Sequence, residues 1–242
     1  MSEWLHIFFF QIFPYICATV LLLGSWLRFD RDQYSWRSSS SEMMRKRQLV
    51  IGSNVFHLAV LPLLVGHVVG MLTPASWMLA VGITVQQHAM AEFILGGTAG
   101  LVCFVGALIL LHRRLFDRRI LRTSSWSDLF ILILIVVQLG MGMATLPASW
   151  EDQKSGFTLL HAAQWAQHLV MLKPDAWTLI MPIPFVYKAH IVMGLVLILI
   201  TPFTRLVHVW SVPIWYLGRA YQVVRVPYRK GGRQRKDEWQ SA

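Results

Sequence analysis

Four histidines lie inside long uncharged stretches of the sequence and are the first candidates for chemistry. His57 and His67 lie in one stretch, and His190 and His208 lie in another, nearer the C-terminus. An ionisable side chain is costly in an apolar environment, so each of these residues needs a specific partner. A neutral imidazole nitrogen is a good metal ligand, which makes metal binding one interpretation. The alternative is that the histidines only form hydrogen bonds between packed helices.

The elements that must position these histidines are membrane-spanning helices. Of the 242 residues, 55% are hydrophobic and only 14% are charged, too few charges for an ordinary water-exposed surface. Five stretches approach or exceed the ~20 residues that cross ~30 Å of hydrocarbon: Trp4 to Leu27, Leu49 to Leu72, Phe93 to Leu111, Leu129 to Trp150 and roughly Phe185 to Trp210. Lys188 and Arg205 lie near the ends of the last stretch, where long cationic side chains can snorkel. The sequence therefore predicts an all-α integral membrane protein, a bundle of five transmembrane helices.

Basic residues indicate the direction in which the chain crosses the membrane, because cytoplasmic loops concentrate lysine and arginine. Nineteen of them fall on one side: Arg28, Arg31, Arg37, Arg45, Lys46, Arg47, Arg113, Arg114, Arg118, Arg119, Arg122, Arg205, Arg219, Arg225, Arg229, Lys230, Arg233, Arg235 and Lys236. Only Lys154, Lys173 and Lys188 fall on the other. The N-terminus is predicted to be outside and the C-terminus cytoplasmic.

The same asymmetry explains the net charge of +10 without a nucleic-acid partner. A basic cytoplasmic face is typical of contact with anionic membrane lipid. We expect residues 1–225 to form the five-helix transmembrane domain and residues 226–242 to form a polar, basic cytoplasmic tail. Cys17 and Cys103 lie deep in apolar runs and outside any CxxC or CxxCH motif, which disfavours disulfides, zinc sites and covalently attached haem.

The topology pairs the four histidines by depth. The second stretch runs inward to outward and the fifth runs back, so His57 and His208 share the cytoplasmic half while His67 and His190 share the outer half. Two facing imidazoles at each of two depths suit two stacked haems, because imidazole is a good axial ligand of low-spin iron. Two non-covalent b haems, each with two histidine ligands, are predicted.

The spacing of the histidines differs between the two stretches. His57 and His67 are ten residues apart, about 15 Å of ideal helix, whereas His190 and His208 are eighteen apart, about 27 Å. His67 also falls ~80° away from the helix face of His57. Tilted helices, tilted haem planes, or kinks at Pro62 and Pro202 could absorb the difference of about 12 Å.

Three long segments around these residues resemble the gamma subunit of respiratory nitrate reductase. They are GSWLRFDRDQYSWRSSSS (Gly24 to Ser41), SNVFHLAVLPLLVGHVVGMLTP (Ser53 to Pro74) and KAHIVMGLVLILITPFTRLVHVWSVPIWYLGRAYQVVR (Lys188 to Arg225). The resemblance covers nearly the whole chain up to about Arg225. It implies that His57 and His208 ligate the haem nearest the cytoplasm and that His67 and His190 ligate the distal haem.

The resemblance also implies the partners and the place of the chain in respiration. The chain would lie in a bacterial or archaeal cytoplasmic (inner) membrane and oxidise menaquinol or ubiquinol by the outer haem. A docked iron-sulfur beta subunit would pass the electrons to a molybdenum alpha subunit in the cytoplasm. Nitrate would be reduced on that partner during anaerobic respiration, and the chain itself would hold no nitrate site.

A quinol site is expected between the outer end of the second stretch, around Gly66 and His67, and the start of the third. The family often has a lysine just before the third stretch, whereas this chain has Gln86, Gln87 and His88 there. Either His88 or Gln87 could contact a quinol oxygen, and a histidine could also accept the quinol proton. The alternative is that His88 is merely an interfacial residue at a helix end.

Three other functions compete with this interpretation. A related quinone-linked oxidoreductase could use the same kind of cytochrome b subunit. A proton-coupled transporter could use the histidines as a relay, although the sequence has no inverted repeat and predicts no carboxylate inside a span. A purely structural anchor would leave the four histidines unexplained.

Overall fold

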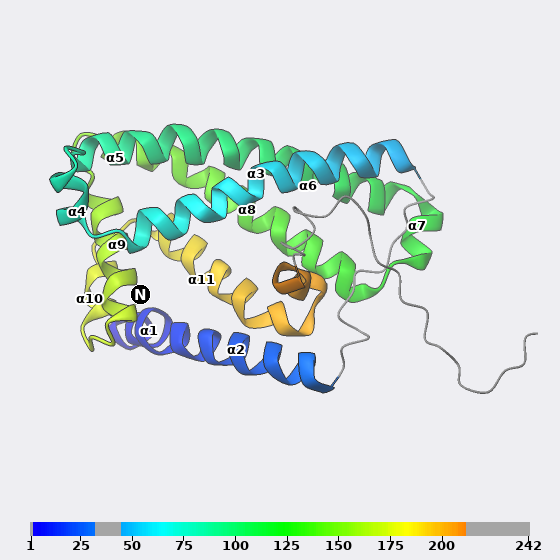
Figure 1. The fold of residues 1–242 in the computed structure, drawn as a ribbon, viewed down its shortest axis with the longest axis horizontal. Helices are drawn as coiled ribbons and strands as arrows, with labels where there is room; N and C mark the ends of the chain where they lie inside the picture. The colour runs from blue at the N-terminus through cyan, green and yellow to red at the C-terminus, as the bar shows by residue number, and fades with distance from the viewer. Residues whose placement is uncertain (1, 32–44, 212–242) are drawn as a thin grey trace, which may run out of the picture. The chain divides into compact units, whose positions relative to one another are not determined.

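Every regular element of the computed structural model, which describes residues 2–31 and 45–211, is helical (Figure 1). Five segments in these ranges are long and apolar enough to cross a membrane, which confirms the predicted five-span helical fold. They are α1 (Glu3–Ile7) with the π-helical turn η1 (Phe8–Ile12) and α2 (Phe13–Arg31); α3 (Lys46–Leu72); α5 (Val85–Ala91) with the π-helical turn η3 (Glu92–Gly96) and α6 (Gly97–Phe116); α8 (Trp126–Asp152); and α11 (Phe185–Ile200) with the 3-10 turn η4 (Thr201–Phe203).

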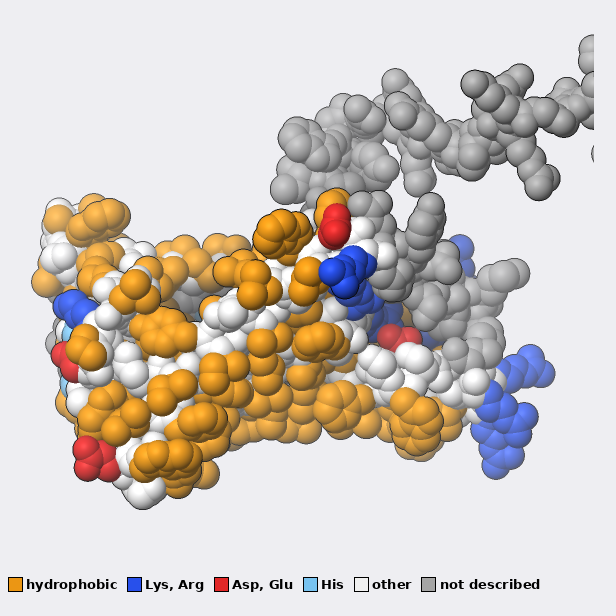
Figure 2. All heavy atoms as spheres, turned by 90° about the horizontal axis from the view of Figure 1, so that it is seen from below, with side chains coloured by type: hydrophobic (Ala, Val, Ile, Leu, Met, Phe, Trp, Pro, Cys, Tyr) orange, Lys and Arg blue, Asp and Glu red, His pale blue; other side chains and the backbone are white. Residues whose placement is uncertain are grey.

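The outward surface of these segments is apolar, as a lipid environment requires. Large hydrophobic side chains such as Leu22, Leu58 and Leu95 are 64%, 76% and 68% exposed. Figure 2 shows hydrophobic side chains along the visible face, with most of the visible lysine and arginine gathered toward one end. Because helices satisfy their own backbone hydrogen bonds, such segments can be surrounded by hydrocarbon.

The spans pack in a continuous series: α3 on α6, α6 on α8, α8 on α11, and α11 on α2. Gly106 permits the closest of these contacts, because a Cβ atom there would lie 2.6 Å from the backbone nitrogen of Phe56 in α3. Gly52 has a similar role on the α3 side, where a Cβ would lie 2.9 Å from Ile109 Cγ2. Small residues at such positions are typical of helix packing in membranes. Among the spans, α3 thus packs mainly on α6, whereas α11 packs on α8 and α2.

The third span begins two helical turns before the predicted Phe93. Thr84 forms a capping box with Gln87: the Gln87 N–H donates to Thr84 Oγ1, and the Thr84 N–H donates to Gln87 Oε1. The helix consequently starts at Val85 and carries Glu92 into the span. Glu92 therefore lies near the start of the helix that forms the third candidate span, although the sequence placed it before that span.

The fifth span ends before the predicted Trp210. Helix α11 stops at Ile200, η4 follows, and Thr204 is extended (φ −121°, ψ 179°) before the second 3-10 turn η5 (Arg205–Ser211) begins. Pro202 lacks an N–H and cannot continue the α-helical hydrogen bonding. The α-helix from His190 to Ile200 advances ten residues, the same number as from His57 to His67. The break thus accounts for the mismatch in spacing, whereas α3 continues as a helix across Pro62.

Arg28 holds the carbonyl groups that this break releases. Its Nη1 donates to the carbonyl oxygens of Pro202 at 2.7 Å and Thr204 at 2.9 Å. On the other side of the break, Arg205 lies 3.6 Å from the buried carboxylate of Asp128, which also lies 3.8 Å from Arg114. The turn that carries His208 is therefore tied to α2 and α8.

The segment between α8 and α11 folds into two helices. Helix α9 (Phe157–Val170) comes first, and α10 (Ala176–Ile180) packs against it. Trp165 of α9 is buried against Phe10, and its Nε1 donates to the Phe10 carbonyl oxygen at 2.8 Å. Residues 32–44 and the predicted 225/226 domain boundary with its basic tail lie outside the described residues.

Replacing Arg28 with alanine should lower the midpoint of thermal unfolding in detergent. The variant leaves the Pro202 and Thr204 carbonyl groups without this charged donor, which costs about 2 kcal/mol. Arg31→Ala removes the same charge from an exposed position three residues later and is the matched control. Equal midpoints for the two variants would show that Arg28 does not stabilise the break.

Candidate functional site

His57 of α3 and His208 of η5 face each other toward the end of the bundle predicted to be cytoplasmic, which is called the inner end below, and the opposite end is called the outer end. Their ring centroids are 6.3 Å apart and the ring planes differ by 67°. His57 Nδ1 lies 2.7 Å from the Ser53 carbonyl oxygen, and His208 Nδ1 lies 2.6 Å from that of Arg205. A carbonyl oxygen can only accept, so each Nδ1 carries the proton. Each Nε2 therefore presents a lone pair for a ligand.

His67 of α3 and His190 of α11 form the corresponding outer pair. Their ring centroids are 6.4 Å apart and the ring planes differ by 45°. His67 Nδ1 donates to the Leu63 carbonyl oxygen at 2.8 Å, which again leaves Nε2 as the acceptor nitrogen. Helix α8 supports His190, because Gln138 Nε2 donates to its carbonyl oxygen at 3.3 Å. A Cβ added at Gly142 would lie 3.1 Å from His190 Cε1.

Both pairs have the separation that one shared metal requires. A metal lies about 2.0–2.1 Å from an imidazole nitrogen and the ring centre about 1 Å beyond, so two imidazoles on one metal have centroids about 6 Å apart. The described residues contain no group of three or more His, Cys, Asp or Glu side chains that could complete a metal site. A two-ligand centre therefore suits a metal whose other ligands come from a macrocycle, and the residues fit b-type haem.

The break after α11 explains how both pairs form although His57 and His67 are on different faces of α3. His190 lies on α11, but His208 lies on η5, beyond the extended Thr204. The inner partner can therefore approach α3 from a different direction than the outer partner. The structure brings each depth-matched pair together, and haem ligation by these residues stays a prediction.

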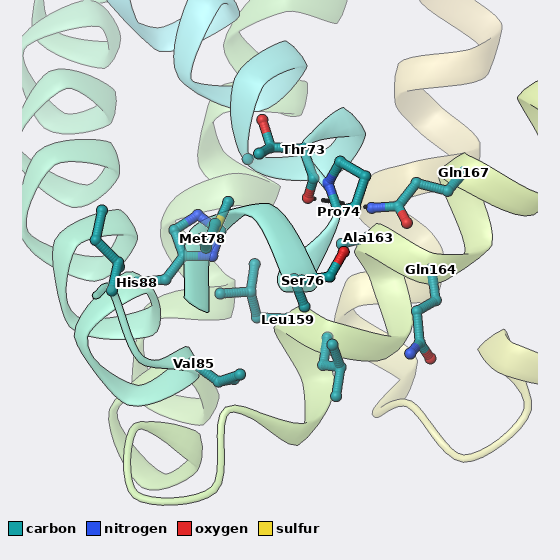
Figure 3. A pocket seen from close by; sticks show the side chains of 14 residues that line it. Thr73, Pro74, Ser76, Met78, Val85, His88, Leu159, Ala163, Gln164 and Gln167 are labelled. Carbon is teal, nitrogen blue, oxygen red and sulfur yellow. Dashed lines mark hydrogen bonds between the residues drawn. The ribbon is translucent and has the colours of Figure 1, made fainter. Parts of the chain in front are cut away.

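A cavity of about 250 Å³ lies at the outer end, between the end of α3, α4 (Ala75–Ala80), α5 and α9 (Figure 3). Figure 3 shows His88 and Val85 on one side of it and Gln164 and Gln167 of α9 on another. The Gln167 amide donates to the carbonyl oxygens of Met71 at 3.1 Å and Thr73 at 3.3 Å, which fixes α9 to the end of α3. The site is thus enclosed by segments that are distant in sequence.

The predicted quinol contacts have different positions in the structure. His88 lines the cavity. Gln87 is not among the lining residues, since its side chain caps α5. Gly66 is exposed, with nothing within 4 Å of an added Cβ, whereas Gly70, one turn outward from His67, lines the cavity.

Two features of the outer site were missed by the sequence analysis. Glu92 lies close to His88, with 3.4 Å between Glu92 Oε1 and His88 Nε2. The spacing of four residues between His88 and Glu92 would indicate this contact on a helix, but the sequence predicted the third helix to begin only at Phe93. The second feature is the α9 wall, the side of the cavity that is lined by α9 residues such as Gln164. No local pattern indicates that this wall would meet α3.

The remaining histidines have local structural partners. His6 is only 5% exposed, and its Nε2 lies 3.1 Å from Lys188 Nζ. His168 Nδ1 lies 3.2 Å from Asp175 Oδ1 at the end of α9. These contacts belong to the packing of the outer end.

Comparison with known proteins gives one consistent family. The sequence profile described as nitrate reductase gamma subunit matches residues 6–227. The chain is 42% identical over 225 residues to the respiratory nitrate reductase 2 gamma chain of Escherichia coli, covering 93% of this chain and 99% of that protein. It is 40% identical to the respiratory nitrate reductase 1 gamma chain of E. coli (92% and 98% covered) and 37% identical to the nitrate reductase gamma chain of Bacillus subtilis (88% and 95%).

Substituting Gly142 with valine should selectively disturb the outer histidine pair. The added side chain collides with the His190 ring, so haem content should fall by about half while the inner pair keeps its haem. Gly140→Val is the matched control on the same helix, because a Cβ there meets only Phe104 Cε2, at 3.8 Å. The measurement is the reduced-minus-oxidised absorption spectrum per protein. Equal haem content in both variants would contradict the assignment of His190.

Proposed function

The chain belongs to the nitrate reductase gamma subunit family, and from that premise we propose that it is the membrane-anchoring dihaem cytochrome b subunit of a respiratory nitrate reductase. The observation that carries the proposal is the presence of two imidazole pairs, at 6.3 Å and 6.4 Å, at different depths of a five-span bundle. His57 and His208 would hold the inner haem, and His67 and His190 the outer one. Haem b bound in this way supplies reversible one-electron transfer.

The protein's own contribution is to fix the orientation of the ligands. Backbone carbonyl groups hold the Nδ1 protons of His57, His67 and His208, which directs each Nε2 toward the space between the rings. Such outer hydrogen bonds raise the basicity of a ligand and keep its ring in place. In a membrane, the hydrocarbon around the pairs would keep water away from them and so influence the haem potentials.

The proposed orientation has the N-terminus outside and the C-terminus in the cytoplasm. Its support is the concentration of basic residues in the sequence just before the helix of His57 and close to His208, including Arg45, Lys46, Arg47 and Arg205. An iron-sulfur beta subunit would dock at this face and feed a molybdenum alpha subunit, on which nitrate is reduced. The complex would lie in a bacterial or archaeal cytoplasmic membrane.

Quinol would be oxidised at the cavity near the outer pair. The cavity offers an imidazole at His88, amide groups on α9 and an apolar wall, which suits a hydroxylated ring such as menaquinol or ubiquinol. Oxidation outside and electron delivery inside move negative charge across the membrane. That movement conserves about 2.3 kcal/mol per charge per 100 mV.

Glu92 weakens one argument against a proton-coupled transporter, because it places a carboxylate on the helix of the third candidate span. Family membership nevertheless favours the electron-transfer function. A cytochrome b subunit of another quinone-linked oxidoreductase would also need histidine pairs for haem and a site for quinol. Identification of the subunits that co-purify with the chain separates that function from nitrate reduction.

The pyridine haemochrome assay should find two non-covalent b haems per chain. His67→Ala or His190→Ala should remove the outer haem and leave the inner one largely occupied, because each iron has its own ligand pair. His161→Ala, a half-buried histidine of α9 outside both pairs, is the control and should retain both. A chain without b haem would favour the transporter or the structural anchor, and a single haem would discard one of the two pairs.

His88→Ala should slow haem reduction by menadiol by at least about tenfold, because it removes the polar and proton-accepting group of the cavity. Both haems should remain bound and should be fully reduced by dithionite. The control is His168→Ala, a histidine of the same outer end that does not line the cavity. Unchanged quinol kinetics in His88→Ala would exclude His88 from the quinol site.

A further inference from the structure

We propose that Glu92 is the positioning residue of a carboxylate–imidazole pair, in which it orients His88 and stabilises its positive charge while His88 accepts the quinol proton. This inference rests on the quinol site proposed above. It assigns a function to a carboxylate near the start of the third span's helix, where Glu92 lies against His88 and Gly70.

The geometry of the third span directs the two side chains at each other. His88 and Glu92 are separated by four residues and lie on one helix face. Glu92 Oε1 is 3.4 Å from His88 Nε2, and the two side chains are 18% (His88) and 37% (Glu92) exposed. The π-helical turn η3 begins at Glu92, and such turns are frequent at functional sites.

Gly70 of α3 provides the space for the carboxylate. A Cβ added at Gly70 would overlap Glu92 Oε1 and would lie 3.6 Å from His88 Nε2. Gly70 also lines the cavity, as His88 does, so the carboxylate, the imidazole and the cavity meet at one point. Because glycine has no Cβ, the Glu92 carboxylate can occupy the space that a Cβ at position 70 would fill.

The arrangement assigns a different task to each ring nitrogen of His88. The Nε2–H faces the carboxylate, which leaves the Nδ1 lone pair to accept a proton from a quinol hydroxyl. The resulting imidazolium is stabilised by the negative charge of Glu92, and Nδ1 then releases the proton to the outer aqueous phase. Repetition for the second hydroxyl converts quinol into quinone, with two protons released through His88 and two electrons taken up singly by the haem acceptor.

Glu92→Gln tests the charge while keeping an oxygen that can accept from His88 Nε2. In the intact complex, we expect the maximal rate of haem reduction by menadiol to fall at least about tenfold, with little change in KM. Haem content and dithionite reduction should be unchanged. Glu151→Gln, which removes the same charge from an exposed outer position, is the control and should behave as wild type.

A spectroscopic measurement gives a readout apart from turnover. Binding of 2-heptyl-4-hydroxyquinoline N-oxide to the oxidised protein should produce an infrared difference band from a perturbed carboxylate. The band should be present in Glu151→Gln and absent from Glu92→Gln. Gly70→Ala retains Glu92 but displaces its flexible end, so it should lose the band and slow the rate as Glu92→Gln does.

The outcomes separate the inference from the proposed quinol site. Normal kinetics in Glu92→Gln together with slow kinetics in His88→Ala would overturn the role of Glu92 alone. Normal kinetics in both variants would overturn the quinol site itself. Loss of haem from Glu92→Gln would also overturn the inference, because the carboxylate would then be needed for the fold. Glu92→Asp, which keeps the charge, should recover part of the rate.

Discussion

The cost of leaving a polar group without a partner in hydrocarbon is the constraint on which this structure depends. It requires helices in the spans, because only helices satisfy their backbone groups internally. The same cost explains the hydrogen bonds of the histidines. His57 and His67 direct Nδ1 to the carbonyl oxygen four residues earlier, so one nitrogen is satisfied within the helix and the other faces the opposite imidazole. A side chain that is costly in lipid thereby presents an oriented Nε2 lone pair.

The interruption after α11 is the point at which the chain departs from a simple bundle. A continuous helix would carry residue 208 about 27 Å from residue 190, too far for the depth of His57. Pro202 ends the helix, and the freed carbonyl groups accept from Arg28. Arg28 lies on α2, which packs along α11, so the first span serves the ligand geometry of the last. The turn that carries His208 is therefore held by hydrogen bonds from Arg28 to residues that lie 174 and 176 positions later in the sequence.

The sequence was sufficient to predict the spans and the depth pairing, because hydropathy and the position of a histidine within an apolar run are local properties. The difference in spacing between the two pairs even indicated a distortion, and Pro202 was one of the two candidate positions. The helix start at Val85 was missed because the Thr84 capping box adds two turns of polar sequence to the third span. The α9 wall was beyond prediction, since its contact with the end of α3 depends on tertiary packing through Gln167.

The two ends of the bundle handle charge differently, and the difference suits opposite tasks. At the inner end Asp128 lies between Arg114 and Arg205, so the carboxylate is matched by fixed cations and tied to the helix ends. At the outer end Glu92 faces an imidazole, a group that can gain or lose a proton near neutral pH. A fixed ion cluster would stabilise the proposed docking face, whereas a carboxylate beside a titratable ring gains an interaction when the ring is protonated. The difference therefore agrees with the proposed function, in which protons are released at the outer end and electrons leave at the inner end.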